Sequence, residues 1–424
     1  MSFKRTQLQN GIGITFVPST KFKSNRIDIR FVTPLSEETA SERALIFPVI
    51  FRATEKYPST REVRLATENV YDLDVYCGSG KRGDAQIISV GISFLSNKYS
   101  IDGSDILCDS LDILRQFLLC PKTENGAFIE KYVESEKQRM IDSELARINN
   151  KGVYARCRCE SEMCAGEPYA ISENGTVEQI AAVTPSALYE SYKELLAHSM
   201  IEISAVGDMD EEKTIGFFND VFSSVDRGEI FSADTVSMHK AREAEQRIYE
   251  RQNVTQGKLA LGFSTGICEN DDMAYVLPVF SAVFGAGTTS KLFMNVREKL
   301  SLCYYCSSSI NSSKGIMTVN SGILFENEKK AVDEILVQLA AVQNGEISDF
   351  ELDSAKKGII DDLRATEDSK GSLSSFAFNT AISKNPKTID EKIKEIESIT
   401  KEQVSLVAKG VKLDTYYFLC GKEN

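Results

Sequence analysis

Only two side chains in the sequence carry an imidazole, His198 and His239. They lie 41 positions apart (239 − 198), so no local motif contains both. Zinc hydrolases built on H-E-x-x-H or H-x-x-E-H need two histidines on one helix to hold the metal. The sequence therefore excludes a self-sufficient zinc site of either kind. His198 falls between a predicted helix and a predicted strand and His239 in a charged segment, and we expect neither to be catalytic.

Cysteines form two local clusters that invite a metal interpretation: Cys157, Cys159 and Cys164 in the first, and Cys303 with Cys306 in the second. A structural zinc site needs four ligands, usually as two close pairs. The first cluster lies on a predicted helix, where positions i and i+2 point to different sides. The second lies on a predicted strand, where residues three apart face opposite sides. We therefore expect buried thiols and no metal at either cluster.

The composition is that of an ordinary folded protein. The chain has 424 residues, of which 42% are hydrophobic and 26% charged, and this excludes an intrinsically disordered protein. At about 100–200 residues per domain, the length predicts two or more domains. With 49 Lys and Arg against 62 Asp and Glu, the net charge is −13. Nucleic-acid-binding proteins usually present a basic face, so we expect no nucleic-acid partner.

Neither the N-terminus nor any internal segment resembles a membrane or secretion signal. Polar residues follow Met1-Ser2-Phe3-Lys4-Arg5, and no apolar signal segment is present there. The most apolar segment, residues 273–290, is broken by Pro278 and Gly285 and is too short to cross a bilayer. Ten cysteines without a secretion signal predict reduced thiols. We therefore expect a cytoplasmic protein with no membrane contact.

Several segments recur along the chain in the same order. Residues 44–51 are echoed by residues 274–280 at an offset of 230, and the strand-like segments that end at Gly207 and Gly421 are offset by 214. Two further matches, which lie between these two in sequence order, have offsets of 219 and 216. Four matches with a slowly drifting offset predict an internal duplication. The predicted halves are residues 1–225 and 257–424, and the polar residues 226–256 form a linker that can add a strand to the second sheet.

Local patterns predict both strands and long helices in each half. Segments rich in Val, Ile, Tyr and Phe predict strands at residues 27–33, 86–95, 201–206, 258–264, 316–324 and 415–419. Apolar residues at helical spacing predict helices around residues 107–118, 137–146, 332–339 and 356–365. Thr184 before Pro185 is typical of a helix N-terminus, and Thr400 with Gln403 has capping-box spacing. The expected class is α+β, with two homologous halves that each place helices on one face of a mostly antiparallel sheet.

Four stretches of the sequence resemble the insulinase/pitrilysin-like zinc peptidases, which carry the inverted H-x-x-E-H motif. They are Leu8-Gln9-Asn10-Gly11, the segment from Gly166 to Thr184, Val206-Gly207-Asp208-Met209-Asp210, and the segment from Gly285 to Tyr304. The last is the most specific. The resemblance is greatest to non-catalytic members that lack the metal motif and accompany an active sibling. It implies that the two halves form a clamp-like shell.

The resemblance places apolar residues where the family has its zinc site. Counting back from Phe51-Arg52-Ala53-Thr54 puts the two metal ligands and the base at Ala44, Pro48 and Phe47, none of which can bind zinc or move a proton. The third ligand position falls at Ser143, seven residues after Glu136. The adjacent Glu144 would point about 100° away on a helix. A lone carboxylate does not hold catalytic zinc, so we expect no metal in this chain.

Arg297 and Tyr304 keep the type and spacing of a residue pair that, in the family, reaches a bound peptide from the half without zinc. A guanidinium offers forked donors to peptide carbonyls, and a phenol can donate to an oxyanion. The structural alternative is an arginine paired with nearby acids on a helix and a tyrosine packed in a strand. The resemblance favours the functional interpretation.

The resemblance implies a non-catalytic subunit of a heterodimeric zinc metallopeptidase. A homologous zinc-bearing partner would supply the metal and the base, and this chain, inactive alone, would shape the peptide chamber and position substrate through Arg297 and Tyr304. The net charge of −13 would fit a chamber that favours basic peptides. A homodimer is compatible with the chain in isolation.

Two other functions remain open. The first is a peptide-binding or assembly scaffold with no proteolytic role. The second is a peptidase that is active by itself through unusual ligands such as Glu136, Glu144 or the cysteines.

Overall fold

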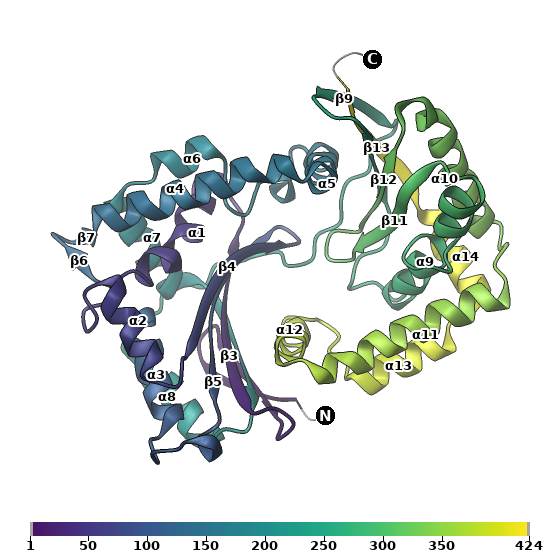
Figure 1. Ribbon diagram of the computed structural model, residues 1–424. Helices are drawn as coiled ribbons and strands as arrows, with labels where there is room; N and C mark the ends of the chain where they lie inside the picture. Colours follow the sequence, from purple (N-terminus) through teal and green to yellow (C-terminus); the bar gives the residue numbers. More distant parts are fainter. Residues whose placement is uncertain (1–2, 422–424) are drawn as a thin grey trace. The chain divides into compact units, whose positions relative to one another are not determined.

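The computed structural model describes residues 3–421 (Figure 1), and close contacts divide the chain into two compact units. The first unit comprises the segment up to Leu145, Ile171–Asp234 and Thr366–Pro386. The second comprises Ala146–Ala170, Thr235–Ala365 and the segment from Lys387 onward. Each unit thus includes one helical segment that lies, in sequence, within the other half.

The first unit is built on a six-stranded sheet with the order β1-β2-β8-β3-β5-β4. Its strands are β1 (Lys4–Gln9), β2 (Ile12–Pro18), β3 (Ser24–Pro34), β4 (Asp74–Arg82), β5 (Ala85–Leu95) and β8 (Met200–Gly207). All neighbours are antiparallel except β2 and β8, which are parallel. In the centre of the sheet, Ile29 lies between Val90 and Ile203, and all three side chains are buried.

Most helices of the first unit cover one face of this sheet. They are α1 (Ala40–Ile50), α2 (Thr60–Glu68), α3 (Ile106–Leu119), α4 (Glu130–Ala146), α6 (Val177–Ala182), α7 (Pro185–His198) and α8 (Glu211–Ser223). A short hairpin, β6 (Thr123–Glu124) and β7 (Ala127–Phe128), precedes α4. Alternate strand residues such as Phe16, Ile203 and Ala205 pack against these helices in one continuous core.

Helix α12 (Lys370–Ala381) lies on the opposite face of the same sheet (Figure 1). The strand residues Val17 and Val206, which alternate with the core-facing ones, pack against Leu373 and Ala377. The helix is also held by a hydrogen bond from the Ser374 hydroxyl to the buried carboxylate of Asp28. The sheet is therefore covered on both faces in its centre, and one of the covering helices comes from late in the sequence.

The second unit contains a five-stranded sheet with the order β11-β12-β10-β13-β9. Its strands are β9 (Gln246–Gln252), β10 (Gly257–Ser264), β11 (Cys303–Asn311), β12 (Ile316–Ile323) and β13 (Lys412–Gly421). Only β13 and β9 pair in parallel. The order and directions match those of β4-β5-β3-β8-β2 in the first unit, as an internal duplication would produce. Strand β9 comes from the predicted linker.

Helices of the second unit again cover one face of the sheet. They are α9 (Leu277–Phe284), the π-helix Leu292–Lys299, α10 (Glu328–Gln343), α11 (Asp349–Ala365), α13 (Ile389–Ser398) and α14 (Lys401–Gly410). Apolar residues from both layers form a second continuous core. The predicted capping box is present, because Thr400 accepts from the Gln403 backbone and Gln403 bonds back to Thr400.

Helix α5 (Lys151–Met163) covers the other face of the second sheet. Ala155 and Cys159 pack against Ala260 and Tyr417. The helix approaches closely at Gly262, where an added Cβ would lie 2.8 Å from the sulfur of Met163. A glycine is therefore needed at this strand position for the helix to pack.

The observed class is the predicted one, α+β with two mostly antiparallel sheets and helices on one face of each. Five of the six predicted strands and all four predicted helices lie within observed elements, and the sixth strand, predicted at residues 316–324, extends one residue beyond β12. Two helices, α5 and α12, lie instead on the opposite faces of the two sheets. Within residues 3–421, every helix is too short or too polar to span a bilayer.

Candidate functional site

The positions predicted for the first two metal ligands and the base are part of the hydrophobic core. Ala44 and Phe47 lie on α1 with 7% and 0% of their surface exposed. The Phe47 ring packs 5.5 Å from the ring of Phe31 on β3. Pro48 follows in the same helix and is half-buried. None of these side chains carries a ligand atom, so the helix contributes packing and no metal chemistry.

The carboxylates near the third ligand position are engaged in other interactions. Glu136 on α4 is buried and forms ion pairs with the guanidinium groups of Arg52 and Arg139, the latter at 3.0 Å. Ser143 is exposed, and the neighbouring Glu144 accepts a hydrogen bond from the Asn174 amide at 2.7 Å. The two guanidinium groups thus compensate the charge of the buried Glu136 carboxylate. Among residues 3–421, no group of three convergent ligand atoms is found around α1 and α4.

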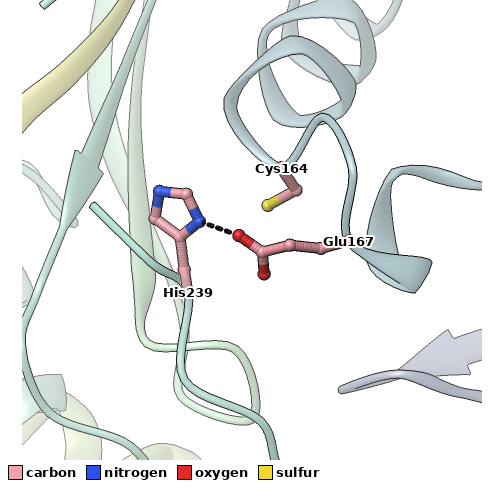
Figure 2. Close-up of side chains that lie close together, drawn as sticks. All are labelled: Cys164, Glu167 and His239. Carbon is pink, nitrogen blue, oxygen red and sulfur yellow. Dashed lines mark hydrogen bonds and ion pairs between the residues drawn. The ribbon is translucent and has the colours of Figure 1, made fainter. Parts of the chain in front are cut away.

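The one convergent group of metal-ligating side chains in the described residues lies in the second unit and consists of Cys164, Glu167 and His239 (Figure 2). The Nδ1 atom of His239 lies 2.7 Å from Oε1 of Glu167, and Nε2 lies 3.2 Å from Oδ2 of Asp414. Ligand atoms around a tetrahedral zinc lie about 3.3 Å apart. The shorter nitrogen–oxygen distance is that of a direct hydrogen bond and leaves no room for a metal between the two atoms.

Charges around His239 explain this arrangement without a metal. Lys314 pairs with Glu167 at 2.7 Å, and Arg242 pairs with Asp414 at 2.8 Å. Burial disfavours the charged imidazole, but the hydrogen bonds to Asp414 and Glu167 outweigh it, and the His239 pKa is raised. The pKa values of both carboxylates are lowered by these cationic partners despite burial. The two carboxylates therefore favour the protonated form of His239, and their contacts tie residues 239–242 to β13 and to the loop after α5.

Arg297 and Tyr304 lie on either side of the junction between the π-helix and β11. The π-helix ends at Lys299, and Ser301 adopts a positive φ of 51° before the strand begins at Cys303. The Arg297 guanidinium lies over the Phe293 ring at 4.6 Å and 3.5 Å from the exposed carboxylate of Glu298. An exposed pair of this kind contributes little stability, and it matches the structural alternative of an arginine paired with a nearby acid on a helix.

Tyr304 is the extra residue of a β-bulge. Cys303 pairs with Ile323 and Tyr305 with Gly322, so Tyr304 has no partner on β12. Its side chain is 73% exposed, and its hydroxyl makes no hydrogen bond within residues 3–421. The structural alternative, a tyrosine side chain packed in the strand, is therefore not observed. The bulge instead directs the phenol to solvent.

The same bulge corrects the predicted orientation of Cys303 and Cys306. The expectation that they face opposite sides assumed a regular strand. Because the bulge adds one residue, their partners on β12 are Ile323 and Ser321, which face the same side. The proximity of Cys306 and the charge of Arg297 lower the Cys303 pKa, whereas Cys303 and burial raise that of Cys306. In the other cysteine cluster, Cys159 and Cys164 are buried as expected, whereas Cys157 is only half-buried.

The fold and the altered α1 define a class of protein, a metallopeptidase-like chain with apolar residues at its metal-ligand positions. A sequence profile described as the peptidase M16 inactive domain matches residues 182–359. The chain is 31% identical to "Probable inactive metalloprotease YmfF" of Bacillus subtilis over 97% of this chain and 96% of that protein. The chain therefore belongs to the M16 peptidase family, the insulinase/pitrilysin-like family that its motifs resemble.

Other relatives extend the comparison. "Uncharacterized zinc protease YmxG" of the same Bacillus strain is 24% identical over 57% of this chain and 58% of its own length. A crystal structure of a conserved protein from Enterococcus faecalis is 26% identical, with a TM-score of 0.91 over 100% of this chain and 99% of that one. The peptidase M16 inactive domain from Pseudomonas fluorescens is 16% identical, with a TM-score of 0.82 over 99% and 98%, and supports the fold alone.

Proposed function

We propose that this protein is the non-catalytic subunit of a heterodimeric zinc metallopeptidase. One contrast carries the proposal. The zinc positions Ala44, Phe47 and Pro48 are apolar, whereas Arg297 and Tyr304 keep their spacing and remain accessible. Loss of the metal site with retention of the substrate signature is what a subunit needs when another chain supplies the catalytic ion.

In this function, the two accessible side chains contact the peptide. The Arg297 guanidinium donates to carbonyl oxygens of the substrate backbone, and its forked geometry fixes their orientation. The Tyr304 hydroxyl donates to the oxyanion that forms when a zinc-bound water attacks the scissile carbonyl. Neither role requires a metal or a base in this chain. Both therefore act in trans on a site built by the partner.

The expected partner is a homologous chain that carries an intact H-x-x-E-H and binds the zinc ion. Bacillus subtilis contains relatives of this chain named as an inactive metalloprotease and as a zinc protease, so proteins of both kinds occur in one organism. We place the complex in the cytoplasm, with a peptide as substrate and with no nucleic-acid or membrane partner. The net charge of −13 supports the absence of a nucleic-acid partner.

A reconstitution experiment tests the proposal. This chain and a zinc-bearing homologue from the same organism are purified separately, mixed at equal concentration and assayed with a mixture of quenched fluorescent peptides. We expect a complex of one copy of each chain and cleavage well above the sum of the two separate activities. An assembly scaffold with no proteolytic role would form a complex without this gain, and that result would overturn the proposed function.

A further inference from the structure

An open cleft of about 890 Å³ lies within the second unit, between the N-terminus of α5 and the sheet face beneath it. Its lining includes three cations, Lys151, Arg156 and Lys258, and no carboxylate. The charged residues that line this cleft are all cations, which contrasts with the net charge of −13 of the whole chain. The proposed function assigns it no role.

The floor of the cleft is formed by neighbouring residues of β10, β11 and β12. Gly322 pairs with Lys258 on one side and with Tyr305 on the other. A Cβ at Gly322 would lie 2.7 Å from the Tyr305 ring and 3.3 Å from the Lys258 ammonium. The glycine therefore clears the space in which the ammonium approaches the ring face, 5.7 Å from its centroid.

The wall of the cleft is the first turn of α5. Asn150 caps the helix by accepting a hydrogen bond from the Val153 backbone at 3.2 Å, and the first amides of a helix have no acceptor within it. Gly152 lies against the Tyr305 hydroxyl, since a Cβ there would lie 3.1 Å away. The positive end of the helix and the side chains of Lys151 and Arg156 thus border the same space.

The cations of the cleft are only weakly neutralised. Lys151 bonds the Gln252 amide oxygen at 2.6 Å, and Lys258 bonds the Gln256 amide oxygen at 2.6 Å. Arg156 alone has an acidic partner, Glu160, at 3.4 Å. Glu250, which accepts from the same Gln252 side chain that binds Lys151, is occupied by Tyr154, Gln252, Tyr417 and Arg158. The ammonium groups of Lys151 and Lys258 can therefore still bind an external anion.

The cleft also offers polar groups without partners. The Asn320 Oδ1 atom is buried and accepts no hydrogen bond in the part of the chain described, and the Tyr305 hydroxyl makes none either. An amide oxygen accepts a hydrogen bond from an N–H or O–H group. A ligand that carries a negative charge and an N–H group close together would therefore match both the ammonium groups and the Asn320 amide. A peptide that bears a carboxylate has both.

We propose that this cleft binds a carboxylate of an extended peptide, either its C-terminus or an acidic side chain, with Lys151 and Lys258 as the charged contacts. The peptide N–H next to the carboxylate donates to Asn320. This proposal takes from the proposed function only the assumption that the natural ligand is a peptide. It adds that the peptide carries a carboxylate that binds in the cleft. It also opposes the expectation from net charge that basic peptides are preferred.

Binding of synthetic peptides to the full chain alone tests this site. Fluorescence anisotropy is measured with labelled alanine–serine peptides that end in a free carboxylate or in a carboxamide, and with a carboxamide peptide that contains one glutamate or one glutamine. We expect each carboxylate peptide to bind about tenfold more tightly than its neutral match, and this preference to shrink as salt is added. Equal binding of charged and neutral peptides would overturn the proposal, as would equal competition by inorganic phosphate.

Variants locate the binding. Lys151→Gln and Lys258→Gln should each remove most of the preference for the carboxylate, whereas Lys394→Gln, an exposed lysine on α13, should leave it unchanged. A preference that survives both cleft variants would place the carboxylate elsewhere and reject the site. The comparison of charged with neutral peptides on the unaltered chain stands even if one variant fails to fold. Because no second subunit is present, the result does not depend on whether the heterodimer forms.

Discussion

Cys303 and Cys306 lie on the same side of β11 because the bulge at Tyr304 adds one residue between them. Arg297 lies close enough to favour the Cys303 thiolate. One backbone irregularity therefore has two consequences. It exposes the phenol that we assign to substrate, and it places an activated thiol beside the guanidinium that we assign to the same role.

Cys303 should be the most reactive thiol of the native protein. The proximity of Cys306 and the charge of Arg297 lower its pKa to about 7, below that of an ordinary thiol. We expect alkylation by iodoacetamide to be roughly tenfold faster than for an ordinary thiol and to rise with pH around 7. Peptide mass spectrometry after timed labelling measures the rate at each cysteine.

Cys108 provides the internal control for this experiment. It is exposed, but burial of part of the thiol and the nearby Asp105 raise its pKa, so it should react slowly despite its access to solvent. Arg297→Gln should raise the Cys303 pKa and slow its alkylation at pH 7. Faster labelling of Cys108 than of Cys303 would contradict the described geometry.

The hydrogen bonds around His239 should give the protein a pH-dependent stability. Because the folded protein raises the His239 pKa above 6.5, the contribution of His239 is complete below about pH 6.5 and is lost as the pH rises through the raised value. The pKa values of Glu167 and Asp414 are lowered, so their contributions are lost only as the pH falls below about 4. His239→Gln should therefore cost about 2–4 kcal/mol of unfolding free energy at pH 5.5 and less at pH 9.

Urea unfolding at the two pH values measures this difference. His198→Gln is the matched control, because His198 makes a single hydrogen bond to a backbone oxygen at the end of α7. We expect that variant to change stability by less than about 1 kcal/mol at both pH values. An equal cost of His239→Gln at pH 5.5 and pH 9 would show that folding does not raise the His239 pKa.

The former zinc helix should behave as core. Phe47 is completely buried, so Phe47→Ala should reduce the free energy of unfolding by about 3–5 kcal/mol. Phe350→Ala, at a position 68% exposed, should change it by less than about 0.5 kcal/mol. Denaturant titration followed by circular dichroism compares the two. A small cost at Phe47 would mean that α1 is not packed as described.

The chain alone should bind no stoichiometric zinc. Glu136 is neutralised by two arginines, and the group around His239 is closed by direct hydrogen bonds. After dialysis against zinc, elemental analysis should find less than about 0.1 zinc per chain for a protein without a closed ligand set. About one tightly bound zinc per chain, with peptide cleavage that a chelator abolishes, would revive a peptidase that acts through unusual ligands.

The sequence predicts the regular elements well because their signals are local. Apolar alternation defines strands such as β5 and β8, and Thr184 and Thr400 mark helix starts through their own side chains. The prediction that the apolar residues Ala44 and Pro48 cannot bind zinc is equally local, because a residue type alone decides whether a side chain can bind metal. The fold class was therefore predictable from the sequence, and the absence of a metal stays a prediction.

Features that depend on distant contacts could not be predicted. The packing of α5 and α12 on the second faces of the sheets depends on matching surfaces far apart in sequence. The bulge at Tyr304 is set by its pairing with β12, so alternation misplaced Cys303 relative to Cys306. The side chains of Glu167 and Asp414 bind His239, yet both are distant from it along the chain, so the charged segment around His239 did not predict these contacts.

The central claim is that this chain holds the substrate while another holds the metal. Its most direct test is the kcat/KM of the reconstituted pair when only this chain carries Tyr304→Phe or Arg297→Ala. We predict at least a tenfold loss for each, with zinc content and complex mass unchanged, and no loss for the controls Tyr99→Phe and Arg61→Ala. An unchanged kcat/KM in both signature variants would contradict the account.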